Sequence, residues 1–406
     1  PIRGILPMAI GAREQGYKEI LVPFDNAREA AVAQGLRIIP IRTLFDAARH
    51  LNGEKEIPPY ELDINTLLID ARKSDVDFSD VKGQSYAKRA IEVAASGGHN
   101  ILMQGPPGSG KTMLARRIPT ILPDLTLDEA LETTKIHSVS GLLPRGMALI
   151  ATRPFRSPHH TLSEAALAGG GTYHLRPGEV SLAHNGLLFL DELPEFKKSV
   201  LEVLRQPLED GETNICRIAS SLTFPSRFML AVAMNPCPCG YLGDIHHGCS
   251  CTDQNVSNYR NRISGPLLDR IDLHVDVPAL SRDEMGSTSL SESSASIKER
   301  VNKAREKQLK RFSKLPGVFC NARMGSKQIR NFCQLTPECS SIIRNAIDRL
   351  GLSARAYDRV LKVARTVADL DDSDVIAPQH LCEAIQYRSL DRMMGSRVNN
   401  ISQKAA

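Results

Sequence analysis

The sequence lacks any hydrophobic run that approaches the about 18 apolar residues of a membrane-spanning helix, and it contains no tryptophan. No signal peptide is visible, although the chain begins at Pro1 and not at Met, so we expect its true N-terminus to be missing. These absences exclude a membrane span and favour a cytoplasmic protein. The rest of the composition, 42% hydrophobic and 24% charged, is ordinary for a soluble globular protein. The length of 406 residues suggests about two to four domains.

A strong excess of one charge is also missing. The net charge of +5 permits a nucleic-acid partner but does not indicate one. Basic residues concentrate at 297–314, where eight Lys or Arg stand against two Glu. This run predicts an exposed basic helix, for which a solvated surface and contact with DNA are both open interpretations.

A glycine-rich segment in the first third of the chain matches the phosphate-binding loop pattern. It follows a short buried strand (101–103) and opens a helix (113–118), which is the context this motif needs. Glycines let backbone N–H groups approach the phosphates, Lys111 would reach the β- and γ-phosphates, and the Thr112 hydroxyl would hold Mg²⁺. We expect ATP to bind at Gly105, Pro106, Pro107, Gly108, Ser109, Gly110, Lys111 and Thr112.

Two further apolar strands end in polar side chains. The strand at 187–190 is followed by Asp191 and Glu192, and the strand at 228–234 by Asn235. In α/β sheets the carboxyl ends of the strands carry the ligand site. We therefore expect Asp191 to organise Mg²⁺ and Glu192 to act as the base for the attacking water. Asn235 could orient that water, or it could simply form a turn before Pro236.

Residues 1–52 read as alternating helices (6–15, 26–34, 41–51) and strands (19–22, 36–40), which indicates a piece of an α/β layer. The text of residues 1–23 resembles the end of a Lon-protease-type domain. That resemblance implies a Ser–Lys dyad, but the stretch that should carry the lysine has none, and the first lysine is Lys18. We therefore expect no proteolysis. Gly53 and two prolines then indicate a linker.

A long insertion (125–183) follows the phosphate-binding loop and its helix. Its Arg153 and Arg156 could touch DNA phosphates in a pore, or they could be solvated loop residues. His159 and His160 would point to opposite faces of a strand, which argues against a shared metal. The triplet at 169–171 predicts a mobile loop tip. A hairpin is predicted at 213–224, where Arg217 could also face a nucleic acid.

The nine cysteines include two closely spaced pairs. Four thiols within a short stretch can wrap one tetrahedral Zn²⁺, although the C-x-C spacing is less common than C-x₂-C, and His246 and His247 lie between the pairs as substitutes. Structural zinc and reduced free thiols both remain open, while disulfides are not expected in a reducing cytoplasm. The possible zinc ligands are Cys237, Cys239, Cys249 and Cys251.

The C-terminal third is predicted to be helical. Apolar stripes recur at helical spacing, Gly351 would end one helix and Pro378 would begin another. The expected divisions are 1–52 (partial Lon-protease-like, inactive), 53–75 (linker), 76–285 (ATPase core with inserted hairpins and the cysteines), 286–317 (Ser-rich linker and basic helix), 318–398 (helical lid) and 399–406 (tail).

The segments around 186–197 and 235–276 resemble the YifB/ComM family of magnesium-chelatase-like AAA+ ATPases, and the likeness extends over roughly residues 1–395. This resemblance implies an α/β fold in which a P-loop AAA+ parallel-sheet domain carries a C-terminal helical lid. By the same resemblance Arg270 is the arginine finger, which reaches the neighbouring subunit's γ-phosphate, and Arg355 is the sensor that covers the nucleotide from the lid. A ring, most often a hexamer, follows from such a finger.

The family resemblance further implies a DNA motor that acts on single-stranded or branched DNA and drives branch migration while donor DNA recombines during natural transformation. Two other classes stay open, namely a chelatase-type motor that remodels a metal-inserting partner and a chaperone-like ATPase that acts on proteins. DNA-stimulated ATP turnover separates the first class from both others.

Overall fold

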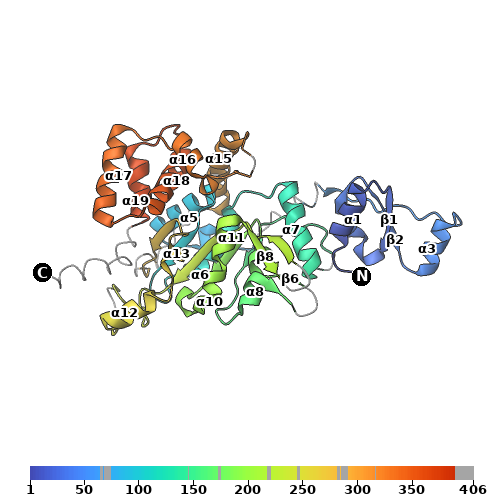
Figure 1. Ribbon diagram of the computed structural model, residues 1–406, viewed down its shortest axis with the longest axis horizontal. Coiled ribbons are helices and arrows are strands. Elements are labelled where there is room, and N and C mark those ends of the chain that lie inside the picture. Colours follow the sequence, from blue (N-terminus) through green and yellow to red (C-terminus); the bar gives the residue numbers. More distant parts are fainter. Residues whose placement is uncertain are drawn as a thin grey trace.

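The computed structural model shows an α/β core with a small N-terminal unit at one end and a bundle of C-terminal helices packed on the core (Figure 1). Among the described residues no helix is long and apolar enough to cross a membrane. The expectations for Arg217, His246 and the 399–406 tail fall outside the described part of the chain. The structure describes residues 1–64, 67, 75–144, 146–171, 175–216, 221–244, 247–280, 284, 291–315 and 317–388.

The N-terminal unit is the α/β layer that the sequence predicts. Strands β1 (Glu19–Pro23) and β2 (Arg37–Ile41) pair in parallel, and helix α1 (Ile5–Glu14) packs beside them. The last helix, α3 (Leu44–Leu51), begins later than its apolar pattern indicates. The cause is a cap, because the Thr43 side chain accepts a hydrogen bond from the Asp46 N–H.

The helix predicted at 26–34 is interrupted. A single α-turn, α2 (Ala27–Ala30), lies between two 3-10 turns, η1 (Phe24–Asn26) and η2 (Ala31–Ala33). The chain then leaves through Gln34, whose φ of 34° lies in the left-handed region. A residue with that backbone cannot continue a right-handed helix, so the segment stops there.

A parallel five-stranded sheet forms the centre of the molecule, in the order β11-β3-β10-β7-β4. All of its neighbouring pairs run parallel, so every strand ends at the same edge of the sheet. We call this the carboxyl edge, and we call the opposite one, where the strands begin, the amino edge. The strands are β3 (Ile101–Gln104), β4 (Phe155–Arg156), β7 (Leu187–Leu190), β10 (Met229–Met234) and β11 (Leu273–Asp276).

Side chains on the two faces of the sheet belong to two separate hydrophobic cores, because successive side chains along a strand point to opposite faces. Met103 and Phe189 pack on the face covered by α5 (Ser85–Gly97), α6 (Lys111–Ile121) and the C-terminal helices. The opposite core is made by the other strand residues together with the segments that follow β7 and precede β11. Because β3, β7 and β10 are buried along their whole length, the sheet is a rigid support for whatever lies at its edges.

The insertion at 125–183 is more ordered than its composition suggests. It supplies the edge strand β4 and a two-residue antiparallel pair, β5 (Gly169–Gly170) with β6 (Arg176–Pro177). The predicted mobile tip at 169–171 is therefore wrong for its first two residues. Gly169 has φ 112°, and a Cβ there would lie 2.7 Å from the Arg176 carbonyl oxygen, so the glycine serves a close backbone approach.

The hairpin predicted at 213–224 is confirmed as β8 (Glu212–Cys216) paired with β9 (Ser221–Pro225). The other helices of this region connect strands of the sheet or lie within the insertion. They are α7 (Leu127–Ser140), α8 (Glu164–Ala168), α9 (Glu179–Leu182), α10 (Lys198–Val203), α11 (Arg205–Asp210), α12 (Asp253–Arg260) and α13 (Gly265–Leu268).

The C-terminal part is helical, as predicted. Gly351 ends the helix that carries the first predicted stripe, with φ 65°, and Pro378 occupies the first turn of the last helix. The apolar positions of both stripes, including Ile343 and Val360, face the core shared with the sheet. The helices are α15 (Ser294–Phe312), α16 (Ser326–Phe332), α17 (Pro337–Leu350), α18 (Ala354–Leu370) and α19 (Pro378–Gln386).

The expectation of a freely exposed basic helix at 297–314 is wrong. Helix α15 buries Ile297, Val301 and Phe312 against α5, α6 and α18. Most of its cations also have acidic partners inside the chain, one of them on α15 itself and the others outside the helix. The ion pairs are Lys298 with Asp124, Arg300 with Glu92 and Glu292, Lys303 with Glu299, Lys307 with Asp372 and Arg311 with Asp369.

Candidate nucleotide site

The phosphate-binding loop runs from the end of β3 into the start of α6, as its sequence context predicts. Gly108 and Gly110 have φ values of 75° and 85°, which side chains rarely adopt. A Cβ on Gly105 would lie 2.0 Å from the Val277 carbonyl oxygen, so that position also needs glycine. The loop therefore turns tightly and aims its backbone N–H groups, with the N-terminus of α6, at one point on the carboxyl edge.

Lys111 folds back over this loop. Its Nζ donates to the carbonyl oxygens of Gly105 and Pro106, both at 2.8 Å. The side chain is largely buried, and this burial lowers the pKa of Lys111, against the opposing effect of the Asp191 and Glu192 carboxylates. The ammonium group is thus held beside the phosphate position by acceptors that a phosphate oxygen can replace.

The two acids after β7 take different positions. The Thr112 hydroxyl donates to Asp191 Oδ2 at 2.6 Å, so the two expected Mg²⁺ contacts already lie together. A hydroxyl and a carboxylate on one side of a phosphate loop are oxygen donors of the kind Mg²⁺ prefers. Glu192 has a left-handed backbone, φ 52°, and a half-exposed side chain that extends from the edge. A non-glycine residue in this conformation is found at functional sites more than elsewhere.

Asn235 follows β10, the strand that lies between β3 and β7. Its Oδ1 is 3.4 Å from Lys111 Nζ. The strand order thus brings together three segments far apart in the sequence, namely the loop, the two acids and this amide. Asn235 thus lies beside Lys111, and the Asp191 and Glu192 carboxylates are close enough to affect the pKa of Lys111.

His160 is a neighbour that the sequence did not assign to this site. Its Nδ1 is 3.6 Å from Glu192 Oε2, and its ring stacks at 4.0 Å from that of His159. The prediction that these two rings point to opposite faces of a strand is wrong, because the segment after β4 is not a strand. The sequence holds a signal for this contact. His160 follows the strand β4, which runs parallel to β7, so the segments after both strands lie at the carboxyl edge.

Arg270 lies at the amino edge, away from the phosphate-binding loop. Asn100, the residue before β3, donates from its side chain to the Arg270 carbonyl oxygen at 2.8 Å. The four residues of β3, about 13 Å of strand, separate Asn100 from the loop. The Arg270 guanidinium contacts Glu209 and donates to the Pro266 carbonyl oxygen, yet its buried Nε has no hydrogen-bond partner among the described residues.

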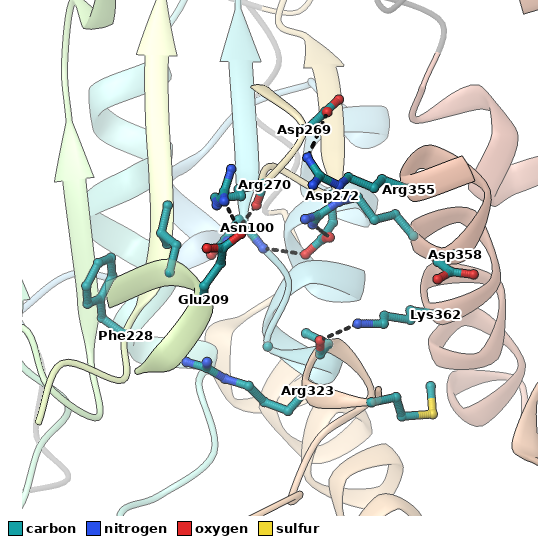
Figure 2. A pocket seen from close by; sticks show the side chains of 15 residues that line it. Asn100, Glu209, Phe228, Asp269, Arg270, Asp272, Arg323, Arg355, Asp358 and Lys362 are labelled. Atoms are coloured by element: carbon teal, nitrogen blue, oxygen red, sulfur yellow. Dashed lines mark hydrogen bonds and ion pairs between the residues drawn. The ribbon is translucent and has the colours of Figure 1, made fainter. Parts of the chain in front are cut away.

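Arg355 lies beside Arg270, and the expectation that it covers a nucleotide from the lid stays a prediction. It projects from the first turn of α18, 68% exposed, with Nη1 3.8 Å from Asp269 Oδ2. Figure 2 shows both arginines on the wall of one cavity of about 340 Å³. The cavity opens at the amino edge, so within one chain neither arginine faces Lys111.

A buried ion pair anchors this second group of residues. Arg359, one turn after Arg355, contacts Asp272, and the Asn100 N–H donates to the same carboxylate at 3.1 Å. Burial alone would raise the pKa of Asp272, but Arg359 and His99 hold it well below its usual range. The carboxylate therefore stays charged and ties α18 to the start of the sheet.

The four cysteines of the two C-x-C pairs converge. Sγ of Cys237 lies 3.3 Å from that of Cys239 and 3.7 Å from that of Cys249, and all four sulfur atoms lie within 4.8 Å of one another. These separations are far longer than the about 2.05 Å of a disulfide. Four thiolates at about 2.3 Å from one tetrahedral Zn²⁺ would be about 3.8 Å apart, so Cys251 and its three neighbours fit a zinc ion.

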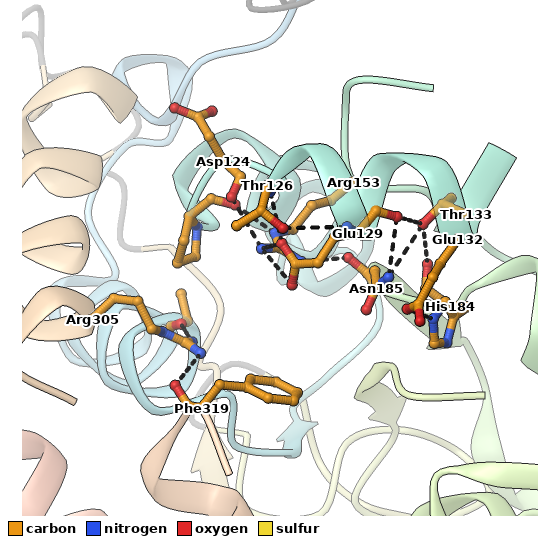
Figure 3. A network of polar contacts seen from close by, with 12 residues as sticks. Asp124, Thr126, Glu129, Glu132, Thr133, Arg153, His184, Asn185, Arg305 and Phe319 are labelled. Atoms are coloured by element: carbon orange, nitrogen blue, oxygen red, sulfur yellow. Dashed lines mark hydrogen bonds and ion pairs between the residues drawn. The ribbon is translucent and has the colours of Figure 1, made fainter. Parts of the chain in front are cut away.

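Arg153 and Arg156 of the insertion, which the sequence left open as DNA contacts, both have hydrogen-bond partners within the chain. Arg153 is partly buried and donates to the Asn185 carbonyl oxygen at 2.7 Å and to Glu129 at 3.2 Å (Figure 3). Arg156 forms a two-bond pair with Glu179, at 2.6 and 2.7 Å. Both earlier interpretations of Arg153, a DNA contact and a solvated loop residue, are therefore wrong, because it joins the insertion to the core.

Two family models match the chain: "Magnesium chelatase, subunit ChlI" over residues 77–285 and "Magnesium chelatase, subunit ChlI C-terminal" over residues 291–388. The chain is also 43% identical over 397 residues to "Competence protein ComM" of Haemophilus influenzae, covering 97% of this chain and 76% of the relative. It belongs to the ComM and YifB family of magnesium-chelatase-like AAA+ proteins. YifB of Escherichia coli has the same identity over 398 residues and the same coverage.

Membership in the ComM and YifB family confirms the resemblance seen in the sequence, and the sheet and helical domain confirm the fold class. A more distant relative is the "Magnesium-chelatase 38 kDa subunit" of Rhodobacter capsulatus, which is 26% identical over 177 residues, or 39% of this chain and 50% of that protein. The magnesium-chelatase-like AAA+ family goes with ATP and Mg²⁺ as ligands, and the Thr112 hydroxyl and the Asp191 carboxylate lie together at the phosphate-binding loop.

Proposed function

We propose that the protein is a ring-forming, Mg-dependent ATPase whose nucleotide lies at the seam between two subunits. One observation supports this proposal above the others. The loop, the acids and Asn235 occupy the carboxyl edge, whereas Arg270 and Arg355 occupy the amino edge of the same sheet. A closed ring brings the amino edge of one subunit to the carboxyl edge of the next, and only then is the site complete.

In this mechanism one subunit binds ATP, and the next supplies part of the charge that stabilises the transition state. Lys111 exchanges its carbonyl acceptors for β- and γ-phosphate oxygens, and Thr112 and Asp191 would hold Mg²⁺. The metal would supply positive charge that neutralises the phosphates. Glu192 accepts the proton of the attacking water, which Asn235 orients.

Arg270 and Arg355 from the neighbouring subunit then approach the γ-phosphate. The Arg270 side chain is buried, and its Nε has no hydrogen-bond partner in the described part of the chain, so this N–H is available for an acceptor in addition to Glu209 and the Pro266 carbonyl. Arg355 is exposed and needs only to leave Asp269. Charge developing on the phosphate oxygens is what two planar guanidinium groups stabilise best.

The substrate that this motor moves is proposed to be DNA, either single-stranded or branched, in branch migration during recombination in natural transformation. The family relationship to a protein named for competence supports this proposal. The location would be the cytoplasm and the ring most simply a hexamer. The second candidate, an ATPase that remodels a protein partner, is favoured by the match to magnesium-chelatase subunits.

ATP turnover in the presence of DNA separates these two candidates. We expect single-stranded or forked DNA to increase the rate severalfold and labelled branch points to move only when ATP is present. A Glu192→Gln protein, which keeps the nucleotide site but cannot activate water, should bind the same DNA without moving it. Turnover that ignores single-stranded, duplex and branched DNA alike would contradict the DNA motor and leave the protein-remodelling candidate.

The proposal also includes a structural Zn²⁺ held by Cys237, Cys239, Cys249 and Cys251. The distances between the sulfur atoms and the all-thiol donor set support zinc over Mg²⁺, which prefers oxygen ligands. Backbone N–H groups reinforce the sulfur positions, since Cys239 N donates to Cys251 Sγ at 3.4 Å. Metal analysis of the purified protein should find about one zinc per chain.

A further inference from the structure

The four cysteines lie between two parts of the nucleotide site. The first pair begins two residues after Asn235, and the second pair leads directly into α12. We propose that the metal they hold is a clasp that fixes the phosphate-binding loop and Asn235, so that zinc controls ATP binding without touching the nucleotide. This inference rests on the proposed nucleotide site and adds the residues that hold it in place.

The first contact of the clasp is with the loop itself. Gly240, buried and with φ 88°, packs so closely on Pro107 that a Cβ would lie 2.6 Å from the Pro107 Cδ and 2.7 Å from its Cγ. The Gly240 N–H donates to the Cys237 carbonyl oxygen at 3.0 Å, so this turn belongs to the cysteine segment. Holding the cysteines in place therefore holds one side of the phosphate-binding loop.

The second contact is with the end of β10. Helix α12 follows the second cysteine pair and sends the Arg260 guanidinium back to the Pro236 carbonyl oxygen, at 3.2 and 3.3 Å. Tyr259 of the same helix hydrogen-bonds to the backbone of Asn235. A metal that joins the two pairs thus fixes Asn235 from both directions along the chain, since one pair follows it and the other positions α12.

Packing alone does not hold this segment. Among the described residues of 237–251, Cys237 is the only apolar side chain that is buried. A loop without a hydrophobic core needs a crosslink to keep one conformation, and a tetrahedral zinc supplies it. The thiols of the other three cysteines are partly exposed, so the metal is accessible to exchange.

The test measures zinc content and ATP binding in the full-length protein, with Cys249→Ser/Cys251→Ser as the metal-free variant. We expect about one zinc per chain in the unmodified protein and none in the variant, with ATP affinity lower by about ten-fold or more. Amide exchange should become faster at 105–110 and 235–240 but stay slow in β3, β10 and α18. Cys382→Ser, an exposed thiol in α19, is the matched control and should keep both zinc and affinity.

Two further variants separate the metal from the contact. Cys251→His keeps four zinc ligands, so it should bind zinc and ATP as the unmodified protein does, unlike the metal-free variant. Gly240→Ala should keep zinc but weaken ATP binding, because the added Cβ would press on Pro107. A zinc-free variant that binds ATP as well as the unmodified protein would overturn the clasp, and so would an unmodified protein that takes up no zinc on reconstitution. ATP binding and turnover by the zinc-loaded protein test the nucleotide site separately, so the two failures are distinguishable.

Discussion

The two edges of the central sheet differ in how they are built and in what they carry. The carboxyl edge carries motifs that directly follow strands: the phosphate loop after β3, the acids after β7 and Asn235 after β10. The amino edge gathers Arg270, Arg355 and their acidic partners from a loop, a helix start and a turn of α11. Under the proposed function, the carboxyl edge would bind ATP and Mg²⁺, and the amino edge would supply positive charge to a nucleotide on the neighbouring subunit. On that proposal, neither edge alone is a complete catalytic site.

The largest effect is expected at the carboxyl edge. Lys111→Ala removes the ammonium that faces the phosphates, which should cost about 3 kcal/mol of ATP binding, roughly a hundred-fold, and abolish measurable turnover. The fold should persist, because Lys111 Nζ bonds only to acceptors of the site itself. Fluorescent-nucleotide titration and thermal melting check both statements, with Lys310→Ala, an exposed position of α15, as the control. Normal ATP affinity in Lys111→Ala would contradict the assignment of the loop.

Arg270→Ala tests the amino edge, where binding and hydrolysis should separate. ATP should bind with near-normal affinity, while turnover falls about a thousand-fold or more, as for loss of an arginine finger. Mixing this variant with Glu192→Gln, which should trap ATP, recreates intact seams wherever one subunit supplies Glu192 and its neighbour Arg270. The mixture should therefore recover turnover that neither variant has alone. Rings shown to contain both variants but inactive would rule out a shared site.

Arg355→Ala tests whether this arginine acts on the nucleotide of its own subunit or on that of the neighbouring subunit. We expect turnover to fall roughly ten- to a hundred-fold, or about 1.4 to 2.7 kcal/mol, less than for Arg270 since Arg355 is exposed and held only by a long ion pair. If both arginines act on the neighbour, mixing Arg355→Ala with Arg270→Ala leaves every seam defective. Recovery in that mixture would mean that Arg355 acts on the nucleotide of its own chain. The two arginines of the amino edge would then not act together on the neighbouring subunit.

The positions of the residues at the carboxyl edge could be predicted from the sequence, because their segments follow directly on buried strands and parallel strands end together. It could not place Arg355, since the position of α18 against the amino edge depends on packing with α5, far away in the chain. The same reason explains the errors over Arg153 and the basic helix. A cation looks solvated in a sequence when its partner, such as Glu92 for Arg300 or Glu129 for Arg153, lies far from it.

The smallest effect is expected from substituting His160. This residue contacts Glu192 at the carboxyl edge of the same subunit, so its effect does not depend on the neighbouring subunit's arginines. His160 Nδ1 lies 3.6 Å from Glu192 Oε2, and both side chains are partly exposed, so the pair is worth no more than about 1 kcal/mol. If this contact holds Glu192 away from the water position, His160→Ala should raise basal turnover by up to about five-fold. Affinity for ATP should not change, because in the described part of the chain His160 contacts Glu192, His159 and Phe196 but not the phosphate-binding loop. His159→Ala is the matched control, since that ring stacks on His160 but does not pair with Glu192. Steady-state rates of the two variants decide the point, and a slower His160→Ala protein would show instead that the histidine positions the base for attack.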